Sequence, residues 1–217
     1  MTGWTVPPGL AFDNHAERLE ACVFTVVCDV LDAAVVAAKE RIERLYQTDT
    51  GEAASRKSPT DTYHLENLPN KGQLFETFFL NPAILKLAER FLGAQFIAQF
   101  IAQDVWSFGI LPGTLAYHPH ADDDVRTPGT PLSMVMTYPL VDFTPDNGGT
   151  RVVPGSHWIP HYPKRSDCSG ETNINAPTGP CVALFGSRPH LLSVSAERSV
   201  FEDLVLASVE PAPASSG

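Results

Sequence analysis

Several features that would direct this chain to a particular class of proteins are scarce or missing. Its 217 residues include only four cysteines, none in a CxxC spacing, so we expect reduced thiols and not a disulfide framework. Every apolar stretch is interrupted by a charged residue or glutamine before the roughly eighteen residues that a membrane span needs. The first ten residues lack the basic and apolar regions of a secretory signal, so a cytoplasmic location is expected.

Positive charge is also in short supply. The chain carries 15 Lys and Arg residues against 25 Asp and Glu residues, a formal net charge of -10. Such a field repels polyanions, and no basic stripe interrupts it, so nucleic acid is not expected as a partner. The hydrophobic fraction of 43% and the length are ordinary for one soluble globular domain.

The first part of the chain predicts two helices and a strand. Residues 22–30 are apolar and β-branched enough for a strand, and a helix is expected over residues 33–46 with Asp32 as its N-cap. A second helix begins after Asn81 as N-cap, with Pro82 in the first helical position, and ends at Gly93.

From residue 94 onward, short apolar runs alternate with Pro and Gly turns. Several short strands at such spacing are typical of a sandwich, jelly roll or barrel. The candidate strands cover residues 94–110, 132–141, 150–153, 181–185 and 191–206.

A histidine and an aspartate two residues apart form the first candidate site. His120 and Asp122 have the spacing that puts both side chains on one face of an extended strand. An imidazole and a carboxylate side by side can fill two adjacent corners of an octahedral metal, and a second histidine would complete a facial triad on Fe(II). The competing interpretation is a surface hydrogen bond, because chance supplies this pair in about a third of such chains.

Neighbouring polar residues leave alternatives open at this site. His118 could compete with His120 as a ligand, but no carboxylate follows it at the same spacing. Asp123 and Asp124 could orient the ligands, although a solvated acidic turn is the simpler interpretation. The acidic cluster lacks the alternating oxygen ligands of a calcium-binding EF-hand loop.

Residues 146–158, DNGGTRVVPGSHW, form the second motif. An Asn-Gly turn leads into a short β run, and a Pro-Gly turn ends it, which physically describes a tight hairpin. The same residues resemble the signature of the phytanoyl-CoA dioxygenase family, and HADDD at residues 120–124 is similar to the HxD segment of that family. The helix NPAILKLAERFLG, before these motifs, and the pattern GSRPH ending at His190, after them, fall in the order expected of that family.

This resemblance implies a double-stranded β-helix, a cupin-like jelly roll, that binds iron. It implies His120, Asp122 and His190 as the Fe(II) ligands and catalytic residues. It further implies one domain over residues 1–210, with an N-terminal α/β portion over 1–93 and the β-helix core over 94–210. The tail over residues 211–217 is expected to be disordered.

The resemblance also implies a site for the cosubstrate 2-oxoglutarate. Arg198 is the candidate partner of the far carboxylate, because a guanidinium can grip a carboxylate with two parallel N–H bonds. Ser193 or Ser195 could assist it, and Thr150 would approach the cosubstrate from a neighbouring strand. For Arg151, a place on the surface and a contact with the cosubstrate are equally good interpretations.

His157, inside the Pro-Gly-Ser-His segment, is interpreted as a structural turn residue and not as a ligand. The C-terminal third departs from the family pattern, because the run from Leu191 to Arg198 lacks the expected small residues and Asn and is a few residues short. This departure concerns the cosubstrate site more than the iron ligands.

The leading hypothesis is an Fe(II)/2-oxoglutarate-dependent dioxygenase that uses O2 to oxidise, most simply to hydroxylate, a small organic metabolite. The second hypothesis is a catalytically silent β-helix protein that binds metal or a ligand with an incomplete cosubstrate site. A third, a cupin-like isomerase or metal hydrolase, needs a general base that the sequence does not identify. The sequence does not indicate the substrate or the oligomeric state.

Overall fold

The structure of this chain is a computed structural model, and the residues that it describes fall in several segments. They are residues 12–28, 32–48, 62–65, 68–93, 97–98, 105–110, 133–144, 150–159, 161, 164–185, 190–191, 200–206 and 209–210. Four α-helices lie in the described part: α1 (Phe12–Cys22), α2 (Asp32–Thr48), α3 (Glu76–Phe79) and α4 (Pro82–Leu92). Four 3-10 turns accompany them: η1 (Leu68–Lys71), η2 (Gln73–Phe75), η3 (Ser156–Trp158) and η4 (Arg165–Cys168).

Helix α4 begins and ends where the sequence predicts. The Asn81 side chain accepts hydrogen bonds from the backbone N–H groups of Ala83 and Ile84, which have no partner inside the helix. Pro82 occupies the first helical position, and Gly93 closes the helix with a φ of 89°, a conformation that favours glycine. Helix α2 starts at Asp32 itself, so the expected capping residue lies inside the helix and not before it.

Helix α1 ends on an unusual residue. Val23 has a φ of 76°, in the left-handed region that β-branched residues rarely adopt, and its side chain is completely buried. Its N–H donates to the Leu19 carbonyl at 3.0 Å, and its carbonyl accepts from Phe185 N–H at 3.2 Å. These bonds turn the chain directly from α1 into the first strand without a connecting loop.

The strands of the described segments form three sheets. Their bounds are β1 (Phe24–Val27), β2 (Thr62–Leu65), β3 (Ile97–Ala98), β4 (Val105–Ile110), β5 (Met134–Pro139), β6 (Arg151–Val152), β7 (Thr172–Asn173), β8 (Cys181–Phe185), β9 (His190–Leu191), β10 (Val200–Leu206) and β11 (Val209–Glu210). The large sheet has the order β1-β8-β5-β10-β4-β2, the small sheet has the order β7-β6-β9, and β11 pairs with β3. All of the pairings are antiparallel.

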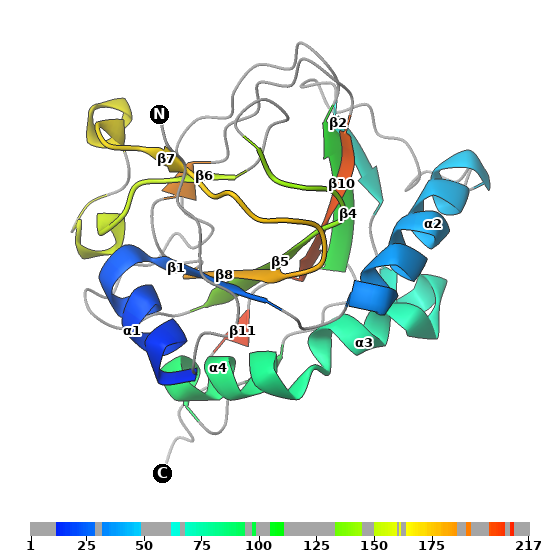
Figure 1. Cartoon of the computed structure of the whole chain (residues 1–217), viewed down its shortest axis with the longest axis horizontal. Helices are drawn as coiled ribbons and strands as arrows, with labels where there is room; N and C mark the ends of the chain where they lie inside the picture. Colours follow the sequence, from blue (N-terminus) through cyan, green and yellow to red (C-terminus); the bar gives the residue numbers. More distant parts are fainter. Residues whose placement is uncertain are drawn as a thin grey trace.

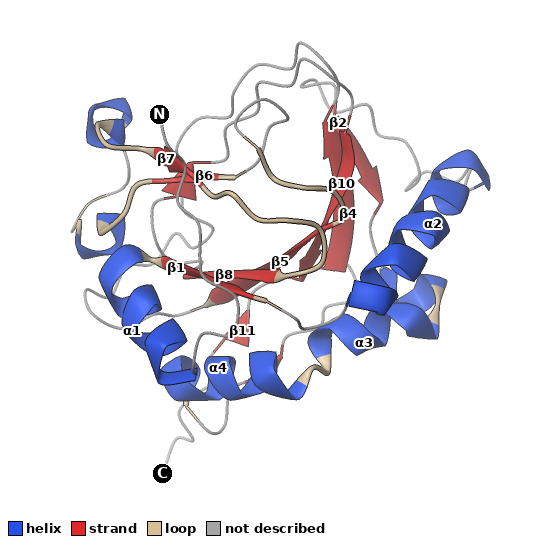
Figure 2. Ribbon diagram, in the orientation of Figure 1, coloured by secondary structure: helices blue, strands red, loops and turns tan. Residues whose placement is uncertain are grey.

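The helices lie on one side of the large sheet and the small sheet on the other (Figures 1 and 2). Aromatic contacts join the helices to the sheet: the rings of Phe78 and Tyr138, and those of Phe91 and Phe185, meet edge to face with centroids 5.0 Å apart. The large sheet therefore has an outer face under the helices and an inner face that turns toward β6 and β7.

Most of the expected elements are present, with different divisions. The predicted strand over residues 22–30 is β1, the stretch 132–141 contains β5, and residues 181–185 form β8 as expected. The stretch 191–206, predicted as one strand, is divided between β9 and β10, which belong to different sheets. Strands β1 and β2, from the N-terminal portion, pair with β8 and β4 and so belong to the same sheet as the C-terminal strands.

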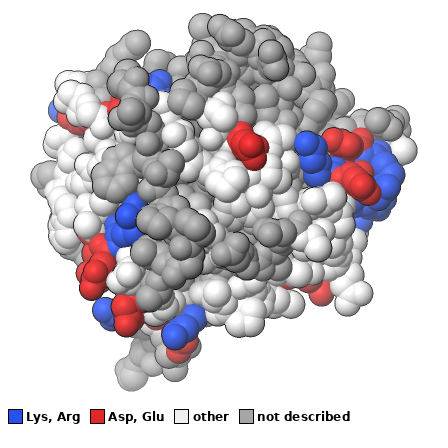
Figure 3. Space-filling model, in the orientation of Figure 1, with Lys and Arg blue, Asp and Glu red and all other residues white. Residues whose placement is uncertain are grey.

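Charged side chains in the view of Figure 3 gather mainly over α1 and α2, where acidic and basic groups are intermixed. Within the described residues, no helix combines the length and apolar character needed to cross a membrane.

Candidate active site

The inner face of the large sheet can be identified from one buried tyrosine. Tyr138 on β5 donates its hydroxyl to the Phe78 carbonyl on α3 at 2.8 Å, so its side chain lies on the outer face. Because side chains alternate along a strand, Val135 and Thr137 lie on the inner face. Their partners on β8, Leu184 and Val182, share that face.

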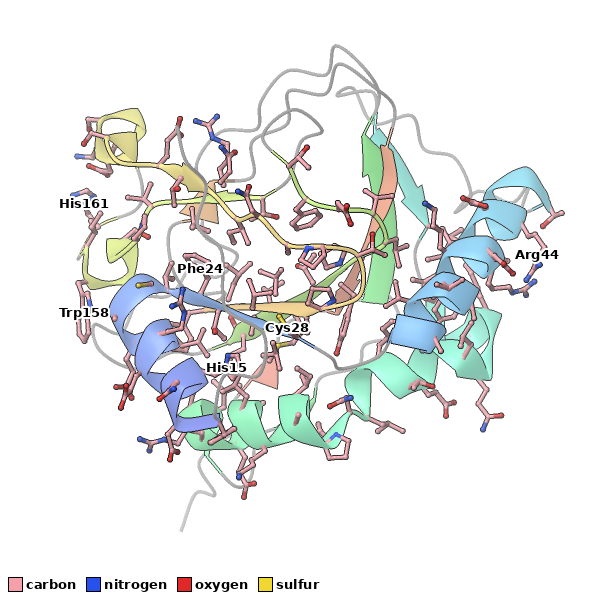
Figure 4. All side chains as sticks on the ribbon, viewed as in Figure 1. His15, Phe24, Cys28, Arg44, Trp158 and His161 are labelled. Atoms are coloured by element: carbon pink, nitrogen blue, oxygen red, sulfur yellow. The ribbon has the colours of Figure 1, made fainter. Side chains whose placement is uncertain are left out.

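Strand β1 continues the same pattern. Phe24 and Val26 pair with Leu184 and Val182 and extend the inner face, whereas Thr25 lies on the outer face. There the Thr25 hydroxyl shares a 2.8 Å hydrogen bond with His15 Nδ1 of α1, and Figure 4 shows His15 on the helix side of the sheet. This buried histidine holds α1 on the sheet and is satisfied there.

Within β1, β5 and β8, the inner face is apolar apart from one hydroxyl. Thr137 is only 5% exposed and is the single polar residue among the inner-face positions of these three strands. Val135, two residues before it, is partly exposed, whereas Leu184 is buried. The sequence gives no signal for Thr137, because the surrounding run of apolar residues hides which face it occupies.

The small sheet brings two of the predicted site residues together. Val152 on β6 is completely buried, and its register partner on β9 is His190. Thr150, two residues earlier in the chain, is 2% exposed, and its carbonyl accepts from Ile174 N–H at 2.9 Å. Alternation puts Thr150 on the same face of β6 as Val152, so the position of His190 is diagonal to Thr150 on the neighbouring strand.

Arg151 belongs to the opposite face of the small sheet. Its guanidinium forms an ion pair with the Glu171 carboxylate, and both side chains are about a quarter exposed. Its register partners are Asn173 and Leu191. The structure therefore supports the interpretation of Arg151 as a surface residue over that of a cosubstrate contact.

His157 has the structural place that its turn context predicts. Its ring is 2% exposed, and Nε2 donates to the Glu20 carbonyl at 2.6 Å, near the end of α1. The ring also lies 4.9 Å from the Trp158 ring and 6.1 Å from the Phe185 ring, measured between centroids. His157 thus fastens η3 to the last turn of α1. Trp158, 62% exposed, and His161 project away from the sheets (Figure 4).

Two buried titratable groups lie under the outer face and are unsuited to chemistry at neutral pH. Burial raises the pKa of the Cys181 thiol to about 12, and burial raises the pKa of the adjacent Tyr138 hydroxyl well above its usual value. Both groups stay protonated. Cys22, Cys28 and Cys181 are free thiols, as expected for these three cysteines.

Most of the predicted site residues lie outside the described residues. These are His118, His120, Asp122, Asp123, Asp124, Ser193, Ser195 and Arg198, and for His190 only the backbone is described. In the part of the chain that the structure describes, no group of three His, Cys, Asp or Glu residues could hold a metal ion. The roles of the predicted iron and cosubstrate ligands therefore stay predictions. Two imidazoles and one carboxylate form a donor set that suits Fe(II).

Comparison with known proteins agrees with this architecture. The sequence model of a family described as phytanoyl-CoA dioxygenase (PhyH) matches residues 24–185. The dioxygenase trt7 of Aspergillus terreus is 28% identical over 138 residues, which cover 59% of this chain and 48% of that protein. The chain thus spans about half the length of this curated relative.

Solved structures with the same fold extend over nearly the whole chain. AviO1 from Streptomyces viridochromogenes gives a TM-score of 0.72 at 18% identity and covers 97% of this chain and 99% of its own. The epimerase SnoN, in complex with Fe3+, alpha-ketoglutarate and nogalamycin RO, gives 0.71 at 16% identity, with 93% and 84% covered. HygX from Streptomyces hygroscopicus, with nickel, 2-oxoglutarate and hygromycin B bound, gives 0.70 at 13% identity, with 92% and 87% covered. The expected jelly-roll fold is confirmed.

Proposed function

This chain belongs to the phytanoyl-CoA dioxygenase family, and on that basis we propose that it is a non-haem Fe(II)- and 2-oxoglutarate-dependent dioxygenase acting on a small organic molecule. The observation that carries the proposal is the family match over residues 24–185, which includes both the HxD segment and the Pro-Gly-Ser-His motif. Hydroxylation is the proposed outcome.

Three side chains would hold the iron: His120, Asp122 and His190. Three others would hold the cosubstrate: Arg198 at the far carboxylate, with Ser193 and Thr150 beside it. One feature of the fold supports this arrangement, since Thr150 directly precedes β6 and lies diagonal to the backbone position of His190 on β9. Thr137, the single polar residue among the inner-face positions of β1, β5 and β8, is a further group available to orient the cosubstrate or the substrate.

When bound, Fe(II) and 2-oxoglutarate supply the activation of O2, with oxidative decarboxylation to succinate and CO2 and transfer of one oxygen atom to the substrate. The residues of this chain would orient the reactants and exclude water from the site. The guanidinium of Arg198 would fix the orientation of the cosubstrate through two parallel hydrogen bonds. The apolar inner face formed by Phe24, Val182 and Leu184 limits water around the reacting groups.

The test is release of succinate from 2-oxoglutarate in the presence of Fe(II) and O2. The His120→Ala and Asp122→Ala variants are expected to lose this turnover and to bind Fe(II) more weakly in calorimetric titration, while their circular dichroism stays unchanged. Full turnover in either variant would refute the proposed ligand set. An Arg151→Ala variant is the control, because Arg151 pairs with Glu171 on the face of the small sheet opposite Thr150 and Val152, and it should retain turnover.

Two alternatives are separated by the same experiments. A catalytically silent β-helix protein would bind metal without forming succinate and without the absorption band of an iron-bound 2-oxo acid. Epimerisation, the activity in the name of SnoN, would leave the product mass equal to that of the substrate. Hydroxylation adds the mass of one oxygen atom, so mass spectrometry of the product decides between these two outcomes.

A further inference from the structure

Strand β10 contains one residue more than its neighbour β4 at a single point. Phe201 pairs with Gly109 on β4. The next β4 residue, Phe108, pairs with Asp203 and not with Glu202. Glu202 is therefore an extra residue without a register partner, which defines a β-bulge. The rest of the pairing of β10 with β4 and β5 is regular.

The end of β5 lies next to this bulge. Asp203 pairs with Pro139, the last residue of β5, so the pairing of β10 with β5 stops where the bulge begins. Pro139 has no N–H to donate, and its carbonyl accepts from Gly179 N–H at 3.2 Å. The extra residue therefore interrupts only the ladder with β4, and proline in a sheet is commonly found beside such an interruption.

A regular strand would direct Glu202 into the apolar core. Leu204 pairs with Tyr138 and belongs to the outer face, and in a regular strand Glu202 would share that face. Tyr138 is completely buried there, and so is Leu65, which lies in the same register row on β2. Burial of a carboxylate among such residues is costly. The bulge releases Glu202 from this alternation.

Pairing with β5 assigns Asp203 to the inner face. Its partner, Pro139, directly follows Tyr138, whose side chain lies on the outer face, so Pro139 takes an inner-face position. Register partners share a face. Asp203 therefore belongs to the inner face, together with Val205, the partner of Thr137.

The bulge changes the face of the residues that precede it. Val200 pairs with Ile110, two residues from Phe108, so Val200 shares the inner face with Asp203. Val200 and Asp203 are three positions apart, which would put them on opposite faces of a regular strand. The extra residue thus reverses the alternation for the positions of β10 that precede Glu202.

We infer that the bulge at Glu202 is a positioning element for the cosubstrate, because it assigns Arg198 to the inner face. Arg198 lies outside the described residues, two positions before Val200, and an even separation along a strand keeps the face. Without the bulge, the same sequence would direct Arg198 to the outer face, under the helices. This inference rests on the proposed function, because it concerns the arginine proposed to hold 2-oxoglutarate.

The test removes the extra residue. In a full chain that lacks only Glu202, Phe201 and Asp203 become neighbours, so β10 is regular and position 198 keeps its face. This variant should fold. With Fe(II) under anaerobic conditions, it should bind 2-oxoglutarate within about threefold of the wild-type affinity, measured by calorimetric titration.

Deletion of Met136 is the matched control for folding. Met136 lies in β5, an interior strand whose register with both neighbours is unbroken. Removal of one residue there turns part of the strand to the wrong face, so this variant should fail to fold. If deletion of Glu202 damages the circular dichroism spectrum as much as deletion of Met136 does, Glu202 belongs to a regular strand and the inference is wrong.

Exchange of Arg198 and Ser199 is the control for the face. The Arg198→Ser, Ser199→Arg double variant keeps the composition and moves the guanidinium by one position, to the opposite face. Its affinity for 2-oxoglutarate should fall about a hundredfold or more through loss of two charge-assisted hydrogen bonds, while its affinity for Fe(II) stays unchanged. The exchange should have the same effect in the chain that lacks Glu202. Recovery of 2-oxoglutarate binding by the exchange in that shortened chain would overturn the inference, because the deletion would then have reversed the face of position 198.

Failure of this inference and failure of the proposed function give different results. If wild type forms succinate but the chain without Glu202 no longer binds 2-oxoglutarate, the inference is overturned and the proposed function stands. A wild-type protein that neither binds 2-oxoglutarate nor forms succinate would refute the proposed function and, with it, the cosubstrate role of the bulge.

Discussion

The left-handed conformation of Val23 allows a sharp test of the junction between α1 and β1. At a φ of 76°, the Cβ atom of any L-residue crowds the following backbone, which costs about 1–2 kcal/mol. Glycine avoids this cost but loses about 0.5–1 kcal/mol more conformational entropy on folding than alanine. Glycine also lacks the buried Cβ methyl of alanine, which contributes about 0.8 kcal/mol. Both of these terms apply at any buried position, whereas the left-handed strain applies only at Val23. Replacing Ala by Gly should therefore cost about 1–2 kcal/mol less at position 23 than at a buried position with extended backbone.

Urea unfolding of the two variants, followed by circular dichroism, measures this difference directly. Both variants lose the two buried γ-methyl groups of valine, so that loss cancels between them. Val26, 2% exposed in the extended part of β1, provides the matched pair, and there the Ala variant should be the more stable. An Ala-to-Gly difference at position 23 as large as the one at position 26 would refute the strain argument.

Three further predictions concern the packing around the sheets. His157→Ala should lower the free energy of unfolding by about 1–3 kcal/mol, because the Glu20 carbonyl loses its hydrogen-bond donor. In urea unfolding, His157→Gln should recover part of this loss. If His157→Ala is as stable as wild type, His157 does not fasten η3 to α1. Asn81→Ala should lower the free energy of unfolding by about 1 kcal/mol, because α4 loses its N-cap, whereas Asn81→Asp should keep the cap and the stability. Equal melting temperatures for the two variants would argue against the cap. The raised pKa of the Cys181 thiol predicts that its contribution to the free energy of unfolding is fully present below pH 9. As the pH rises toward 12, this free energy should fall by about 1.4 kcal/mol per pH unit. Cys181→Ala should reduce this alkaline loss in denaturation measured from pH 8 to 11, and an unchanged slope would contradict it.

Local signals account for the elements that the sequence predicts well. Helix α4 is delimited by Asn81, Pro82 and Gly93, each of which acts on its own turn of the chain, so no tertiary information is needed. Strand β8 is a continuous apolar run that is buried on both faces, and its bounds match the prediction.

The elements that the sequence analysis missed depend on distant contacts. Helix α1 buries only His15, Ala16 and Leu19, and the buried histidine conceals its apolar stripe because its hydrogen-bond partner, Thr25, is on another element. Strand β7 has two residues and exists through its pairing with β6.

The candidate site shows the same division between local and distant information. Residue types and spacing made His120 and Asp122 candidates, and the family resemblance proposed them, together with His190, as the iron ligands. The register that brings His190 opposite Val152, near Thr150, depends on β6 and β9 pairing across many residues. The face on which Val135 and Thr137 lie was hidden as well, because β5 is apolar on both sides and shows no alternation.

The order of strands in the large sheet also has a consequence for synthesis. Its interior strand β10 comes from residues 200–206, whereas the edge strands β1 and β2 come from near the N-terminus. A ribosome therefore exposes β1, β2, β4, β5 and β8 before the strand that joins the two halves of the sheet has left the exit tunnel. Nascent apolar strands must wait for their last neighbour, so expression of this protein should respond to chaperone supply more than that of a helical protein of the same length.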